Sequence, residues 1–178
     1  MNELEKLGKK YGTDKIGKHN YLPIYYNLFK DKRDEVKKVV EIGIGEGASM
    51  KMWWSFFPKA TIFGVDIDIL RVSELFGRMS LIECDQSSQD DLINLMNDTG
   101  PDIDLFIDDG SHKPEDQIFT CEQIIPGLNK GATYIIEDVA DNRVERTIRV
   151  FAHNHNCYVE DKRVGERYDD RLIIIKKQ

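Results

Sequence analysis

Cysteine is scarce in this sequence, and its distribution excludes two kinds of protein. The 178 residues contain three cysteines, Cys84, Cys121 and Cys157, which are widely spaced and odd in number. Such a pattern argues against a disulfide framework and against a zinc site. We interpret the three residues as buried or half-buried thiols in a reducing compartment.

The chain also lacks an excess of positive charge and a long apolar run. Its 25 Lys and Arg are outnumbered by 32 Asp and Glu, which gives a formal net charge of -7. Nucleic-acid-binding proteins usually carry a basic field, so nucleic acid is not expected as a partner. No apolar run approaches the roughly 20 residues that a membrane helix needs, and the charged start of the chain has no signal-peptide core. We therefore expect a cytoplasmic protein without membrane contact.

Apolar patterns predict strands and helices that alternate along most of the chain. We expect one domain over 1–178, which consists of a helical lid segment (1–35) and a core (36–178). Helices are expected over 2–10, 21–30, 45–57 (with a loop at its start), 68–76, 89–96, 114–125 and 143–153. The apolar stripe of the second helix, which includes Tyr21 and Tyr25, is interpreted as core packing.

The expected strands lie over 39–42, 61–66, 80–83, 103–107, 132–136, 158–159 and 172–175. Alternation with helices implies a mostly parallel sheet that is covered on both faces. A charged segment, 160–170, joins the last two strands without a helix, so we expect them to pair antiparallel. The predicted fold is a Rossmann-like, doubly wound α/β fold with a seven-stranded sheet and an antiparallel last strand.

A glycine-rich turn joins the first expected strand to its helix. Gly43 and Gly45 would let the backbone approach a ligand closely, and the following helix N-terminus favours negative charge. Asp66 ends the next strand, 23 residues after Gly43, where a carboxylate can bind both hydroxyls of a ribose. The glycines alone fit NAD, S-adenosylmethionine or an unliganded turn.

Two further features favour S-adenosylmethionine over NAD. Asp85 follows the third strand, where an acidic side chain could meet an adenine amino group. An NAD enzyme would also need room for a second nucleotide half and a substrate domain, which 178 residues do not easily supply.

Two pairs of acidic residues follow the fourth and fifth expected strands. Asp108 and Asp109 open the run that ends at His112, and Glu137 and Asp138 form the second pair. The carboxyl ends of neighbouring parallel strands meet at one sheet edge, where ligands bind. Clustered carboxylates repel one another unless a cation lies among them, and Mg²⁺ prefers oxygen ligands. We predict a divalent-metal site with His112 as general base.

Each of these acidic residues has a simpler interpretation. A single acidic residue can cap the turn after its strand, and Asp109 and His112 could form a structural hydrogen-bonded pair. Turn capping needs one acid and not two adjacent pairs, so the joint pattern favours the metal site.

Together the motifs resemble those of class I S-adenosylmethionine-dependent methyltransferases. More narrowly, they are similar to the metal-dependent sugar O-methyltransferases of the mycinamicin type, which tailor macrolides and related natural products. The matching pieces are 11–15 with His19 and Tyr21, 41–45 running to 52–53, 57–58 and 64–67, 107–112 with Gln117, and 134–138.

The resemblance implies a role for individual positions. It implies that the Mg²⁺ ligands are Asp109, Glu137 and Asp138 and that the proton acceptor is His112. It places the cofactor against Glu41, Gly43, Gly45, Asp66, Asp85 and Asp108. The implied acceptor is a sugar or similar small molecule, and the family's tendency to self-associate implies a possible homo-oligomer.

The sequence departs from this family in size. The macrolide enzymes carry a large extra N-terminal domain, whereas this chain has about 35 residues ahead of its first expected strand. The resemblance therefore implies the chemistry without fixing the acceptor or the assembly. A catechol-type O-methyltransferase, an NAD-dependent oxidoreductase and a non-catalytic cofactor-binding protein of the same fold remain alternatives.

Overall fold

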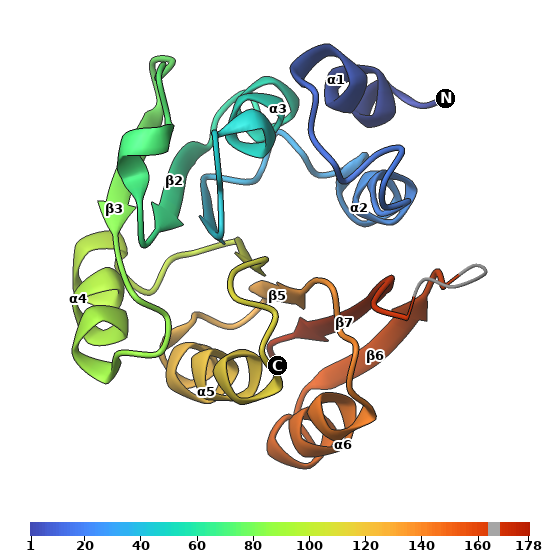
Figure 1. The fold of residues 1–178 in the computed structure, drawn as a ribbon, viewed down its shortest axis with the longest axis vertical. Coiled ribbons are helices and arrows are strands. Elements are labelled where there is room, and N and C mark those ends of the chain that lie inside the picture. The colour runs from blue at the N-terminus through green and yellow to red at the C-terminus, as the bar shows by residue number, and fades with distance from the viewer. Residues whose placement is uncertain (164–167) are drawn as a thin grey trace.

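A seven-stranded sheet forms the centre of the computed structural model, which describes residues 1–163 and 168–178 (Figure 1). The strands are β1 (Lys38–Ile42), β2 (Thr61–Asp66), β3 (Met79–Glu83), β4 (Leu105–Asp108), β5 (Thr133–Ile136), β6 (Asn156–Asp161) and β7 (Arg171–Lys176). Their order in the sheet is β3-β2-β1-β4-β5-β7-β6. Strands β1 to β5 pair in parallel, whereas β7 pairs antiparallel with both β5 and β6. The predicted mostly parallel, seven-stranded sheet is confirmed.

Helices cover the two faces of this sheet in groups of three (Figure 1). They are α1 (Glu3–Tyr11), α2 (Leu22–Phe29), α3 (Ala48–Phe56), α4 (Gln89–Thr99), α5 (Pro114–Ile124) and α6 (Asn142–Phe151). Helices α1 to α3 pack on one face and α4 to α6 on the other. Within the described ranges, none of the helices is long and apolar enough to cross a bilayer.

Strand periodicity explains the two cores. Successive side chains of a strand point to opposite faces, so Val39 of β1 joins the core under α1 to α3, and Val40 joins the core under α4 to α6. All four residues of β4 and of β5 are buried. These continuous apolar strands are typical of a parallel sheet that is covered on both faces.

The helix predicted over 68–76 is wrong. The structure has only a short 3₁₀ turn there, η1 (Ile69–Arg71), and the side chain of Asp68 makes no capping hydrogen bond. Leu70 is 91% exposed, and Ile67 and Leu75 are also exposed. A short helix is stabilised mainly by packing its apolar face. These exposed side chains do not form an apolar face that packs on the core.

Several boundaries also differ from the prediction. Strand β4 begins two residues later than expected and includes Asp108, and β6 is longer than the two residues predicted for it. Part of the charged segment predicted to join the last two strands, residues 164–167, lies outside the described residues. Another 3₁₀ turn, η2 (Ile125–Gly127), follows α5 directly.

Candidate active site

The loops after β1 and β4 meet at the carboxyl edge of the sheet. Gly43 has a φ of 85°, and a Cβ added there would lie 2.0 Å from the carbonyl oxygen of Asp109. Its N–H donates to the carbonyl of Val65 at 2.8 Å, and the N–H of Asp109 donates to Ile42 at 2.9 Å. Glycine is therefore required at this position both for its positive φ and for the close approach of the two loops.

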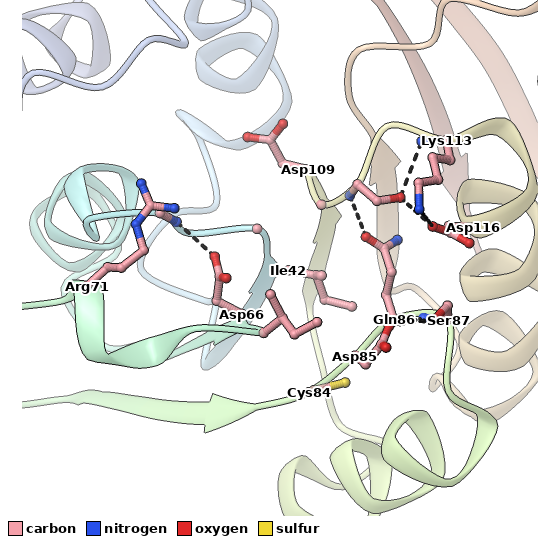
Figure 2. Close-up of a pocket in the computed structure, with 15 residues that line it drawn as sticks. Ile42, Asp66, Arg71, Cys84, Asp85, Gln86, Ser87, Asp109, Lys113 and Asp116 are labelled. Carbon is pink, nitrogen blue, oxygen red and sulfur yellow. Dashed lines mark hydrogen bonds and ion pairs between the residues drawn. The ribbon is translucent and has the colours of Figure 1, made fainter.

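A pocket of about 410 Å³ opens on one side of this contact, and we call it the glycine-loop pocket (Figure 2). Its lining consists of Ile42, Gly43, Gly45, Asp66, Ile67, Arg71, Cys84, Asp85, Gln86, Ser87, Asp109, Gly110, Ser111, Lys113 and Asp116. Four of the predicted cofactor-binding residues, Gly43, Gly45, Asp66 and Asp85, thus line one cavity.

Hydrogen bonds orient Asp66 and Asp85, two of the acidic residues that line this pocket. Asp66 accepts from the N–H of Gly45 at 3.0 Å and from the N–H of Asp68 at 3.1 Å, so its carboxylate fixes the glycine loop. Asp85 accepts from the backbone and the hydroxyl of Ser87. These bonds lower the pKa of Asp85, which keeps it ionised at the pocket wall.

A second cavity, of about 340 Å³, lies on the other side of the glycine loop, and we call it the acidic pocket. Its lining consists of Gly12, Thr13, Asp14, Lys15, Lys18, Gly43, Ile44, Gly45, Glu46, Ala48, Ser49, Asp109, His112 and Asp138. It shares Gly43, Gly45 and Asp109 with the glycine-loop pocket, so the two cavities adjoin.

Three side chains of the acidic pocket lie close enough to share one cation. Asp109, His112 and Asp138 each offer a ligand atom, and these atoms lie within 4.8 Å of one another. His112 and Asp138 have φ values of 58° and 53°, in the left-handed region that residues other than glycine rarely adopt. Such backbone strain clusters at functional sites, where the surrounding structure holds it.

Lys15 supplies a positive charge at the centre of the acidic residues. Its ammonium lies 2.5 Å from Asp109, 2.9 Å from Glu137 and 3.2 Å from Glu41, and its side chain is 1% exposed. Burial alone lowers the pKa of Lys15, but the three carboxylates outweigh burial and raise the pKa well above its ordinary value. The sequence pattern missed this role, because Lys15 is 94 residues from Asp109 and lies in no periodic element.

Two tyrosines at the start of α2 hold the second acidic pair. The hydroxyl of Tyr25 donates to Glu137 at 2.5 Å, and that of Tyr21 donates to Asp138 at 2.6 Å. Burial raises the pKa of both tyrosines, which keeps the hydroxyls protonated as donors. Core packing was therefore an incomplete interpretation of this stripe, since the rings are buried but their hydroxyls bind the candidate site.

The second acidic pair is also tied to the C-terminal part of the sheet. His19 Nδ1 lies 2.5 Å from Asp170 and 3.4 Å from Asp138, and the His19 ring stacks on Tyr21. Burial raises the pKa of Glu137 well above its ordinary value, although Lys15 opposes the shift. The N-terminal segment thus contacts both members of the pair.

Glu41 and Asp108 lie behind the pocket walls. Glu41 accepts from the hydroxyl of Ser49 at 2.7 Å and from the indole of Trp53 at 3.1 Å. Neither Glu41 nor Asp108 is among the described residues that line the two pockets. Their predicted contact with the cofactor stays a prediction.

Asp108 instead orients a residue of the wall. It accepts from the amide of Gln86 at 3.1 Å and from the hydroxyl of Tyr134 at 3.4 Å. Gln86 in turn accepts from the N–H of Ser111 at 2.6 Å, which anchors the loop that carries His112 (Figure 2). Burial raises the pKa of Asp108 to about 7.

Comparison with known proteins finds methyltransferases. No protein-family model matches the sequence. The chain is 37% identical over 144 residues to the 8-demethyl-8-alpha-L-rhamnosyl tetracenomycin-C 2'-O-methyltransferase of Streptomyces olivaceus. It is 36% identical over 146 residues to the mycinamicin VI 2''-O-methyltransferase of Micromonospora griseorubida. These matches cover 76% and 77% of this chain but only 37% and 36% of the two relatives.

Solved structures agree with the sequence comparison. The MycE methyltransferase of the mycinamycin biosynthetic pathway, in complex with Mg, SAH and mycinamycin VI, superposes with a TM-score of 0.80 and 28% identity. That match covers 99% of this chain and 54% of MycE. The SAH-bound methyltransferase PaMTH1 of Podospora anserina, at 13% identity and a TM-score of 0.68, shows likeness of fold alone.

Proposed function

We propose that this chain is a Mg²⁺-dependent O-methyltransferase of a sugar or similar small-molecule acceptor. Its relatives are the S-adenosylmethionine-dependent sugar O-methyltransferases of the mycinamicin type. The proposal depends on one observation, that the glycine-loop pocket and the acidic pocket adjoin at Gly43 and Asp109. A methyl donor in the first pocket and an acceptor hydroxyl in the second would lie next to each other.

The glycine-loop pocket fits S-adenosylmethionine. Gly43 and Gly45 line it without side chains, so a ligand can approach the backbone of the loop closely. Asp66 and Asp85 line the pocket, and their carboxylates would accept hydrogen bonds from ribose hydroxyls and an adenine amino group. When bound, the cofactor supplies the methyl group, so that an oxygen–carbon bond forms as a sulfur–carbon bond breaks.

The acidic pocket fits a divalent cation. Asp109 and Asp138 offer the hard oxygen ligands that Mg²⁺ prefers. Glu137, the third predicted ligand, is outside this group of described residues, and its two oxygens lie on Tyr25 and Lys15. When bound, such a cation lowers the pKa of a hydroxyl and fixes its direction.

In this proposal His112 takes the proton of the acceptor hydroxyl. It lines the acidic pocket, its Nε2 lies 4.0 Å from Asp138, and its side chain is 45% exposed. Because the ring also faces solvent, the proton can leave to water after transfer.

The sheet order argues against an NAD-dependent oxidoreductase. An NAD enzyme of the dinucleotide-binding fold has a parallel sheet in the order 3-2-1-4-5-6, whereas β7 here lies antiparallel between β5 and β6. A catechol-type acceptor remains the second candidate within the methyltransferases, since a cation chelates either kind of vicinal diol.

The homo-oligomer, the single-domain organisation and the cytoplasmic location stay predictions.

Transfer of labelled methyl groups tests the proposal. The purified chain is incubated with methyl-labelled S-adenosylmethionine and a panel of rhamnosides, other glycosides and catechols, with Mg²⁺ or with EDTA. We expect label in at least one glycoside, loss of transfer with EDTA, and a loss of at least about 100-fold in Asp109→Asn, because the cation site is damaged. Transfer that is equal with and without EDTA would contradict the metal assignment, and binding of the cofactor without any transfer would favour a non-catalytic protein.

A further inference from the structure

The ammonium of Lys15 lies among the carboxylates for which the sequence predicts a divalent cation. Its ammonium contacts Asp109 Oδ2, Glu137 Oε2 and Glu41 Oε1 within 3.2 Å. Two of these three carboxylates are proposed metal ligands. The ammonium of Lys15 and a bound divalent cation would therefore contact oxygens of the same carboxylates.

The surroundings of Lys15 show that it is built into this position. The residue is 1% exposed, and it belongs to the segment between α1 and α2. Two backbone hydrogen bonds fix that segment. The N–H of His19 donates to the carbonyl of Asp14, and the N–H of Tyr21 donates to the carbonyl of Lys15. A buried lysine whose backbone is held in this way cannot easily move its charge away from the carboxylates.

We propose that Lys15 is the resident counter-cation of the acidic pocket: it keeps Asp109 and Glu137 together in the absence of metal, and it weakens metal binding by competing for their oxygens. This inference rests on the proposed function, because it requires a divalent cation at Asp109. It makes Lys15 a positioning residue, which acts on the reaction through the ligands that it holds.

Coulomb's law gives opposite signs to the two consequences of removing this charge. Without the ammonium, the buried carboxylates repel one another and the metal-free protein loses stability. The same loss makes the pocket more negative, so a divalent cation binds more tightly. A lysine with a purely structural role would give the first effect without the second.

The test compares Mn²⁺ affinity, followed by the paramagnetic resonance of free Mn²⁺, in the wild-type chain and in Lys15→Met. We expect a dissociation constant at least about tenfold lower in Lys15→Met, from the loss of one nearby positive charge. Lys15→Arg retains the charge and should bind within about threefold of the wild type. Lys18→Met is the matched control, because Lys18 lines the same pocket but is exposed and pairs only with Asp14 among the described residues.

Thermal unfolding supplies the second measurement. Lys15→Met should melt at a lower temperature than the wild type in EDTA and should gain more from Mg²⁺ than the wild type does. If the variant is unfolded in EDTA, Mg²⁺ should restore its fold. Equal or weaker Mn²⁺ binding in Lys15→Met, or a variant that stays unfolded in Mg²⁺, would overturn the inference while leaving the proposed function intact. A wild-type chain that binds no Mn²⁺ would instead overturn the metal site itself.

Discussion

Gly43 is the residue at which the two pockets meet. Its neighbours leave no space for a side chain, because an added Cβ would lie 2.0 Å from the carbonyl oxygen of Asp109. The glycine loop was recognisable from its spacing, but this contact was not, since it joins residues 66 positions apart. The sequence predicted a loop that approaches a ligand closely, and the structure adds a close approach between this loop and the backbone of Asp109.

Substitution at Gly43 should separate this contact from simple backbone strain. Gly17 has nearly the same φ, 88° against 85°, but an added Cβ there meets nothing within 4 Å. We expect Gly17→Ala to lower the free energy of unfolding by about 1 kcal/mol, from the left-handed conformation alone. Gly43→Ala should cost at least about 3 kcal/mol, because strain and a steric clash add.

Chemical denaturation of both variants provides the measurement. The difference between the two alanine variants isolates the contact with the loop after β4, since the φ values of the two glycines are matched. Equal unfolding free energies in the two variants would show that this close approach does not contribute to stability.

At the scale of elements, α2 and the segment before it complete the site from outside the alternating core. The start of α2 brings Tyr21 and Tyr25 to the second acidic pair, and the preceding segment brings Lys15. Helical periodicity identified α2 and its buried face correctly. Periodicity reports burial and not hydrogen bonding, so it could not show that these tyrosines carry donors to the acids.

Removal of one hydroxyl tests this link. Tyr25→Phe leaves the packing of the ring intact but removes a donor to the buried Glu137, so we expect the free energy of unfolding to fall by about 2 kcal/mol. Tyr26→Phe is the control, because Tyr26 is only partly buried and its hydroxyl has no hydrogen bond among the described residues. It should change stability by no more than about 0.5 kcal/mol. A loss of the same size in both variants, measured by urea denaturation, would contradict the role given to Tyr25.

The helix expected over 68–76 is a different kind of error, because the sequence predicted an element that the structure lacks. Local composition favoured a helix, but only Val72 and Phe76 of this segment pack against the core, whereas Leu70 is 91% exposed and Leu75 is also exposed. Packing decides whether a short helix forms, and packing depends on the rest of the fold. By contrast, the apolar runs of β1, β2, β4 and β5 were predicted well, because a buried parallel strand needs continuous apolar sequence.

At the scale of the whole molecule, the sheet order brings the functional loops together. Strands β1 and β4 are neighbours in the sheet although α3, β2, β3 and α4 separate them in the chain. This arrangement sets the glycine loop beside the loop that carries Asp109 and His112, and Glu137 and Asp138 directly follow the neighbouring strand β5. The adjoining pockets are therefore a consequence of topology, and the chain has this topology in common with MycE over 99% of its length.

The distance between a bound metal and the methyl group of the cofactor tests this account most directly. Mn²⁺ in the acidic pocket should strongly broaden the resonance of S-adenosylmethionine labelled with ¹³C at its methyl group and bound in the glycine-loop pocket. The broadening should disappear in Asp109→Asn, which damages the metal site. If the wild-type chain binds both ligands and the methyl resonance keeps its width, the metal and the methyl donor lie apart, and the proposed arrangement is contradicted.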